Sequence, residues 1–175
     1  MFEDIQTPQE MNCAVSFFDL TSFARYVSKC STRELFELLS DYYEFVGEVI
    51  EGAGGCVIKF IGDAGLVAFP EEGVDRGVVG LCKLKQEGDE WLAERGTPCK
   101  HIIKVHFGSV ICGPVGTRSA KRMDVFGQAV NVAATLSSNG FSMTPQVFRK
   151  LSKDTRKLFK KHTPPVTYIP LSEPH

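Results

Sequence analysis

Two apolar runs flank Gly62-Asp63 in the middle of the chain, VIKFI before it and AGLVAF after it. Runs of strand length on either side of a glycine-aspartate turn predict a β-hairpin with a carboxylate at its tip. In a strictly alternating strand, Lys59 would share a face with Val57 and not with Ile58. A lysine on a half-buried face needs a partner or a ligand, whereas a turn aspartate is by itself more typical of a structural role.

Before this hairpin, residues 12–20 (NCAVSFFDL) form an apolar run that predicts a buried strand ending at Asp19. Thr21, Ser22 and Phe23 follow at once and suit the start of a helix, whose backbone N–H groups would face an anion. Ser31-Thr32-Arg33-Glu34 then has the spacing of a capping box, ahead of a helix that ends at the glycines of residues 52–55.

After the hairpin, helical and strand-like periodicities alternate. The expected elements are a helix over 71–95, a strand over 102–112 with a bulge or close approach at Gly108, a helix over 128–137, a short strand over 141–144, a helix over 145–151 and an edge strand over 165–171. This order predicts an α+β fold, a ferredoxin-like split β-α-β core with added helices. Because that fold hosts many functions, it does not identify an activity.

Composition limits the class of protein and its compartment, but it does not identify a reaction. With 175 residues and 43% hydrophobic content, we expect a polar leader over residues 1–10 and one globular domain over 11–172. A net charge of −1 gives no reason to expect nucleic-acid binding. We find no signal peptide or membrane segment, and the six cysteines form no C-x-x-C pair, so we expect a cytoplasmic protein with reduced thiols and no zinc site.

Two aspartates occupy related places, Asp19 at a strand end and Asp63 at a hairpin tip. If their strands are neighbours, the carboxylates converge beside the helix start at residues 21–23. Mg²⁺ prefers one or two carboxylates together with phosphate oxygens, so this arrangement would bind a metal-bound polyphosphate. Two unrelated turn aspartates remain the alternative interpretation.

Three segments together resemble the catalytic domain of class III nucleotidyl cyclases. They are FFDLTSF (residues 17–23), KFIGD (residues 59–63) and DVFGQAVNVAA (residues 124–134). Each motif is weak alone, but the three occur in order and with ordinary spacing, and the resemblance runs from about residue 12 to residue 171.

The resemblance implies a role for each matching residue. Asp19 and Asp63 would bind two Mg²⁺ or Mn²⁺ ions around a nucleoside triphosphate, so that the ribose 3′-hydroxyl attacks the α-phosphorus. Lys59 and Asp124 match the pair that selects the purine, and a lysine donor beside an aspartate acceptor favours adenine, hence ATP. Asn131 matches the residue that orients the ribose. A Lys59–Asp124 salt bridge in the empty protein is compatible with this role.

The chain departs from the family at two places. Thr135 stands where the family has an arginine that stabilises negative charge on the transferring phosphate. A hydroxyl supplies no charge, and loss of one such donor typically costs about 100- to 1000-fold in rate. Near the C-terminus, Lys160 and Lys161 stand in a segment without the glycine of the family's lysine-glycine pair. Either lysine could contact the terminal phosphates, but a solvated basic tip is the favoured interpretation.

In the family each site spans a dimer interface. This chain carries both sets of residues apart from the arginine, so the resemblance implies a homodimer with two equivalent sites, with the Gly113–Phe126 arm and the helix carrying Asn131 at the interface. An adenylate cyclase is the leading hypothesis. The alternative is a catalytically weak, nucleotide-binding regulatory or dimerisation domain, and Lys59 disfavours a guanylate cyclase. A regulatory domain on a longer parent chain is compatible with either hypothesis.

Overall fold

The computed structural model describes residues 2 and 5–173. Within that part of the chain one eight-stranded sheet has the order β2-β3-β1-β4-β6-β8-β7, with β5 paired to β4 outside this path. The strands are β1 (Gln9–Leu20), β2 (Cys56–Ile61), β3 (Ala64–Pro70), β4 (His101–Gly116), β5 (Lys121–Phe126), β6 (Phe141–Met143), β7 (Phe159–His162) and β8 (Thr167–Pro170). The helices are α1 (Phe23–Val27), α2 (Thr32–Gly52), the 3-10 turn η1 (Glu71–Gly73), α3 (Val74–Glu94), α4 (Gln128–Thr135), α5 (Pro145–Lys150) and α6 (Lys153–Arg156).

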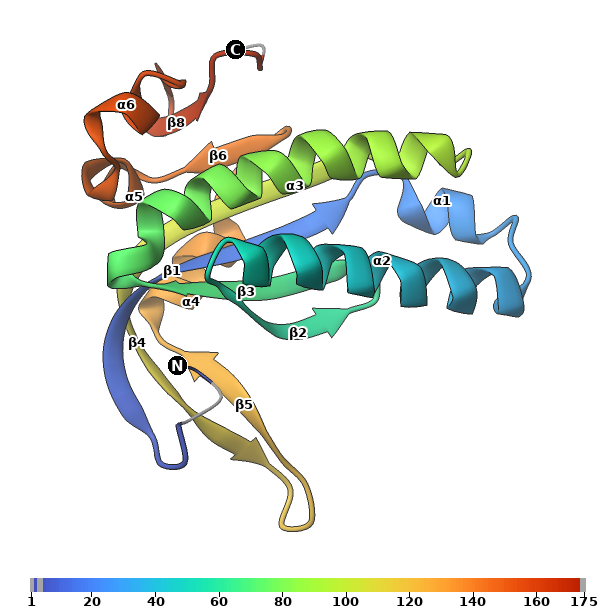
Figure 1. Ribbon diagram of the computed structural model, residues 1–175, viewed down its shortest axis with the longest axis horizontal. Coiled ribbons are helices and arrows are strands. Elements are labelled where there is room, and N and C mark those ends of the chain that lie inside the picture. The colour runs from blue at the N-terminus through green and yellow to red at the C-terminus, as the bar shows by residue number, and fades with distance from the viewer. Residues whose placement is uncertain (1, 3–4, 174–175) are drawn as a thin grey trace.

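The first four core strands confirm the predicted split β-α-β architecture. The pairs β2–β3, β3–β1 and β1–β4 are all antiparallel, and α2 and α3 both pack over one face of this sheet (Figure 1). Beyond the core, β4 and β5 continue as a paired ribbon that projects away from the body as an arm (Figure 1). The fold is therefore the α+β type with a hairpin arm.

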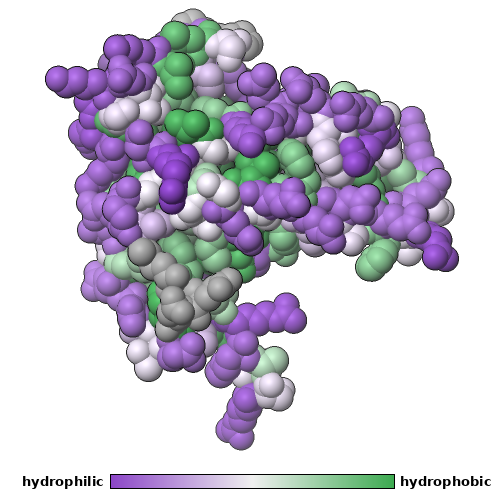
Figure 2. All heavy atoms as spheres, viewed as in Figure 1, coloured by the Kyte–Doolittle hydropathy of each residue, from purple (hydrophilic) through white to green (hydrophobic). Residues whose placement is uncertain are grey.

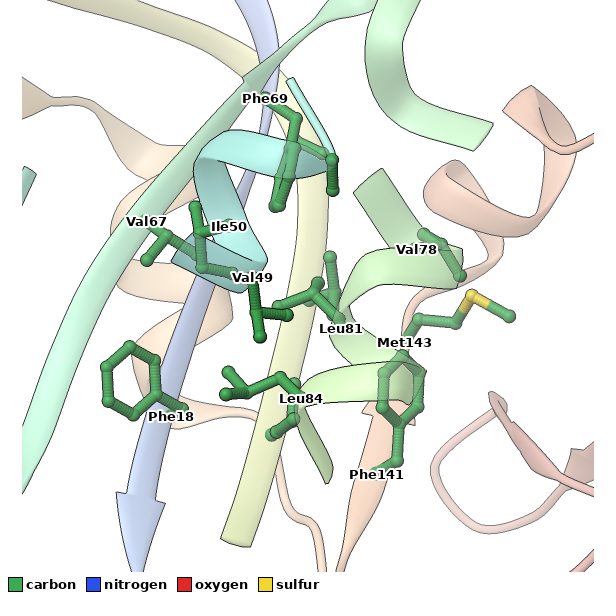
Figure 3. Packing of buried hydrophobic residues seen from close by; sticks show 14 of the residues in the cluster. Phe18, Val49, Ile50, Val67, Phe69, Val78, Leu81, Leu84, Phe141 and Met143 are labelled. Carbon is green, nitrogen blue, oxygen red and sulfur yellow. The ribbon is translucent and has the colours of Figure 1, made fainter. Parts of the chain in front are cut away.

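Helix α2 begins and packs as its sequence predicts. The Ser31 hydroxyl accepts a hydrogen bond from the Glu34 backbone N–H, and the Glu34 carboxylate accepts one from the Ser31 backbone, which forms a complete capping box. The buried side of α2 meets α3 and the sheet in one apolar cluster, in which Figure 3 shows Phe18, Val49 and Leu84 converging. In contrast, hydrophilic side chains cover most of the outer surface over α2 and α3 (Figure 2).

The opposite face of the sheet has its own, smaller apolar cluster. Ala129 and Ala133 of α4 pack there on residues of β1, β3 and β4. Gly108 makes this close packing possible, because a Cβ at that position would lie 3.0 Å from the Ala129 Cβ. The pairing of β1 with β4 runs through Gly108 without a shift in register, so Gly108 is a close-approach site and not a bulge.

The alternation predicted for β2 is wrong. Val57 pairs with Val67, but Lys59 pairs with Leu66, which leaves Ile58 as an extra residue in a β-bulge. The bulge turns Lys59 away from the face of Val57. As a result Val57 packs toward α2 and α3, whereas Lys59 and Ile58 share the α4 side of the sheet.

The two ends of the chain also differ from expectation. The last strand, β8, is not an edge strand, because β7 pairs with it on the outside. At the N-terminus β1 already begins at Gln9, and Phe2 and Ile5 are buried in the smaller cluster. The expected leader includes residues 1, 3 and 4, which lie outside the described residues, so the division into leader and domain stays a prediction.

Candidate functional site

The carboxylates of Asp19 and Asp63 meet where β1 ends beside the β2–β3 turn. One backbone N–H, that of Leu20, donates to Asp19 Oδ1 at 2.8 Å and to Asp63 Oδ2 at 3.3 Å. The antiparallel pairing of β1 with β3 brings the hairpin tip to this strand end, and Gly62 closes the two-residue turn with a left-handed φ of 64°. The predicted convergence of these two side chains is thus present.

The two neighbouring carboxylates repel one another, and the Asp63 carboxyl has a raised pKa. Burial, and then the neighbouring Asp19, raise the pKa of the Asp63 carboxyl to about 6. Neither carboxylate forms an ion pair with any residue in the described part of the chain. A divalent cation between them would offset both the burial of the Asp63 charge and its repulsion by Asp19, which together raise this pKa.

The donor set fits Mg²⁺ or Mn²⁺ in company with phosphate. Among the described residues no group of three or more His, Cys, Asp or Glu side chains could hold a metal on its own. Two adjacent carboxylates leave most coordination positions open, and Mg²⁺ usually fills such positions with phosphate oxygens and water. A metal here would therefore depend on a phosphate-bearing ligand.

The segment after Asp19 is held against Lys100, the residue that precedes β4. Thr21 exchanges two hydrogen bonds with Lys100: its N–H donates to the Lys100 carbonyl at 2.9 Å, and its hydroxyl accepts from the Lys100 N–H at 3.0 Å. Ser22 has a left-handed φ of 60° and makes no side-chain cap, and Phe23 begins α1 and packs against the main core. The three residues expected to face an anion thus adjoin the carboxylates.

Lys59 and Asp124 form the second pair. Lys59 Nζ lies 2.6 Å from Asp124 Oδ2, while Asp124 Oδ1 accepts from the Val125 N–H. The two side chains are 41% and 20% exposed, respectively, so the pair is open to solvent on one side. They line a cleft of about 850 Å³ between β2 and the arm, to which Ile58 and Met123 add apolar surface. A flat apolar ligand with both a donor and an acceptor on one edge fits this lining.

Asn131 and Thr135 form the third pair, one turn apart on the exposed side of α4. The Thr135 hydroxyl donates to the Asn131 backbone carbonyl at 2.8 Å, so it serves its own helix. No hydrogen bond or ion pair between described residues joins any of the three pairs to another. One protomer thus presents the predicted residues as three separate groups.

Two tyrosines of α2, Tyr42 and Tyr43, lie close to the carboxylate pair, and the sequence analysis did not identify them. The Tyr43 hydroxyl donates to the Gly62 carbonyl at 2.7 Å and ties α2 to the hairpin tip. The neighbouring Tyr42 is buried, and its hydroxyl lies 2.8 Å from His101 Nε2, while His101 Nδ1 lies 3.0 Å from Asp89 Oδ1. Burial, and then the Asp63 and Asp19 charges, raise the pKa of Tyr42. No sequence signal marks this network, because Tyr42 also fits the apolar stripe of α2.

Lys160 and Lys161 lie far from these groups in the sheet. Both are in β7, the edge strand, which β8, β6 and β4 separate from β1. Within one protomer they are therefore not neighbours of the carboxylate pair.

The chain is similar to known proteins in both sequence and structure. The family model described as the adenylate and guanylate cyclase catalytic domain matches residues 5–164. The chain belongs to this family. The match includes all three pairs of candidate residues, so the family resemblance expected from the motifs is confirmed.

Similar curated proteins include cyclases of both specificities. An adenylate cyclase of Anabaena cylindrica is 31% identical over 130 residues, which are 70% of this chain and 26% of that protein. The guanylate cyclase soluble subunit alpha-1 of Canis lupus familiaris is 27% identical over 156 residues, 84% of this chain and 22% of that protein. The chain thus spans about a quarter of the length of these relatives.

Solved cyclase structures have the same fold. A bacterial light-regulated adenylyl cyclase superposes with a TM-score of 0.81 at 24% identity, covering 94% of this chain and 53% of the other. The adenylyl cyclase CyaB from P. aeruginosa gives a TM-score of 0.80 at 16% identity, with 96% and 97% of the two chains covered.

No helix within the described residues is both long and apolar enough to cross a membrane.

Proposed function

We propose that this cyclase domain converts ATP to 3′,5′-cyclic AMP and pyrophosphate. The observation that carries the proposal is the Lys59–Asp124 pair at 2.6 Å in the wall of the cleft. A lysine donor beside a carboxylate acceptor matches the edge of adenine, where N1 accepts and the 6-amino group donates. Guanine presents the opposite pattern, so the pair favours ATP over GTP.

The reaction forms one bond and breaks one. The ribose 3′-oxygen loses its proton and bonds to the α-phosphorus, while the bond from that phosphorus to the pyrophosphate oxygen breaks. Divalent ions, when bound at Asp19 and Asp63, supply charge neutralisation and lower the pKa of the attacking hydroxyl. Asn131 orients the ribose, and Thr21, Ser22 and Phe23 line the phosphate end beside the carboxylates.

We further propose a homodimer in which each site uses residues of both copies. The three candidate pairs are separate within one protomer, and a two-fold partner would bring complementary pairs together. The arm also exposes apolar surface: Ile111 and Phe126 are opposite one another across the ribbon, and they are 52% and 50% exposed. Such a patch is typical of a protein interface.

A second candidate function rests on Thr135. Its hydroxyl is hydrogen-bonded within α4 and carries no charge, so it leaves the transferring phosphate without the family's arginine. This favours a domain that binds ATP but turns it over slowly, and that acts by regulation or dimerisation.

Cyclic AMP production from ATP with Mn²⁺ tests both candidates. Three proteins are compared: the parent, Thr135→Arg, and Asp63→Ala as the blank. We expect weak activity in the parent, none in Asp63→Ala, and an increase of about 100-fold in Thr135→Arg, because one charged donor on the phosphate is restored. If neither the parent nor Thr135→Arg makes cyclic AMP while both bind ATP, the regulatory function is the correct one.

A further inference from the structure

Lys104 lies on the same face of the sheet as Asp19, one of the two carboxylates proposed above to bind metal. In β4, Ile103 and Val105 point into the main core, so Lys104 points to the opposite side, toward α4. Phe17 is its direct partner across β1, and Asp19 pairs with Ile102. Lys104 is thus the diagonal neighbour of Asp19, at about 7–8 Å between backbone positions, which is within reach of a long side chain.

The contacts of Lys104 leave its charge uncompensated. Nζ donates to the carbonyl of Ala134 in the last turn of α4 at 3.3 Å, and it forms no ion pair with any described residue. By contrast, Lys85, which is also half-buried, lies 3.3 Å from the Asp89 carboxylate, and the more exposed Lys59 lies 2.6 Å from Asp124. A half-buried ammonium with only a neutral carbonyl can readily take an anion.

We propose that Lys104 binds the phosphates of the nucleotide at the Asp19–Asp63 site. The inference rests on the proposed function and adds a specific residue to it. The end of β1 and the β2–β3 turn hold two carboxylates without a cation, and the neighbouring strand β4 has a lysine without an anion. A metal-bound triphosphate satisfies both, because its cation meets the carboxylates and its oxygens meet the ammonium.

A purely structural role predicts different behaviour. A cation at the C-terminal end of a helix is favourable in itself, so Lys104 could serve only to cap α4. Lys104→Gln separates the roles, since glutamine keeps an N–H donor for the Ala134 carbonyl but carries no charge. Lys104→Arg keeps the charge and changes the shape. Lys83→Gln, on the exposed side of α3 with Glu87 as its partner at 3.7 Å, is the matched control.

The experiment measures binding by titration calorimetry with Mg²⁺ and inorganic tripolyphosphate as the probe, and with adenosine as a phosphate-free probe. We expect Lys104→Gln to weaken tripolyphosphate binding by about 10- to 100-fold, the value of one charged hydrogen bond. Lys104→Arg should stay within about threefold of the parent, since it keeps the charge. Adenosine binding should be unchanged in both variants, and Lys83→Gln should behave as the parent.

Three results would overturn the inference. Tripolyphosphate affinity could be the same in Lys104→Gln and the parent, adenosine affinity could fall in parallel, or Gln and Arg could weaken binding equally with a lower melting temperature. The last result would mean that Lys104 acts only through the packing and stability of the fold. Failure of the proposed function is distinct: a parent protein that binds neither tripolyphosphate nor ATP, with or without Mg²⁺, would refute both proposals.

Discussion

The two charged pairs of the candidate site are built on opposite principles. Asp19 and Asp63 carry like charges, share one N–H donor and have no cation, so the free protein holds them at an electrostatic cost. Lys59 and Asp124 carry opposite charges and satisfy one another at 2.6 Å. In the proposed function the first pair is completed only by a ligand from outside, whereas the second is already complete in the free protein and would share its bonds with a purine. We therefore expect charge removal to act mainly on the first pair, and changes of hydrogen-bond polarity to act on the second.

The largest effect should follow from removing one member of the like-charged pair. Asp19→Ala would lower kcat/KM for ATP by about 1000-fold or more, because it removes one of the two carboxylates proposed to hold the metal. Steady-state cyclic AMP assays with Mn²⁺ check this, with Asp154→Ala as a control, since Asp154 is an exposed partner of Lys157. An Asp19→Ala protein that keeps a tenth of the parent rate would show that the carboxylate pair is not a metal site.

Reversing the polarity of the complementary pair should change selectivity and leave metal binding intact. Lys59→Glu replaces the donor that adenine N1 needs with an acceptor. Asp124→Ser replaces the acceptor that the 6-amino group needs with a hydroxyl donor. We expect the ratio of kcat/KM for ATP to that for GTP to fall by about 100-fold, the loss of two discriminating hydrogen bonds. Competition assays with both nucleotides give the ratio. A ratio that does not change would locate base recognition elsewhere.

The pH dependence of metal binding sharpens the same contrast. Because the pKa of Asp63 is raised to about 6, a proton competes with the metal below that pH. Mn²⁺ affinity in the presence of tripolyphosphate should fall by about tenfold between pH 7.5 and pH 5, since the fraction of ionised Asp63 falls by that factor. Calorimetric titrations across this range measure the change. In Asp63→Asn, binding should be weak at both pH values, and the pH dependence that remains should be that of tripolyphosphate itself, whose terminal phosphate titrates at about pH 6.

The smallest effect concerns stability without metal. Asp63 has a higher pKa in the folded state, about 6, than its ordinary value of 3.8, so its ionisation opposes folding above pH 6, and this cost disappears as the pH falls below 4. Asp63→Asn should therefore raise the free energy of unfolding by about 1 kcal/mol at pH 8, after allowance for solvent screening, and by nothing near pH 4. Urea unfolding at both pH values tests this. A destabilised variant at pH 8 would mean that Asp63 has a structural partner.

Local patterns were sufficient for much of the fold. The capping box at Ser31 and Glu34 depends on atoms three residues apart, so the residues themselves indicate where α2 begins. The turn at Gly62-Asp63 is similar, because its backbone needs a residue that accepts a left-handed φ. The bulge at Ile58 could not be predicted, since it depends on how β2 pairs with β3, and it changes which face Lys59 occupies.

The sequence by itself determined which residue types this domain has for its chemistry, in three motifs whose order identifies the family. The motifs also marked Thr135 as a departure. Only the tertiary structure decided that the Asp63 pKa is raised, that Lys59 closes on Asp124 in the free protein, and that Lys104 shares a sheet face with Asp19. The physical reason is that charge and hydrogen-bond energies depend on distance and burial. The strand register that brings residue 104 to the face of residue 19, and residue 63 beside residue 19, involves partners more than 40 positions apart in the chain.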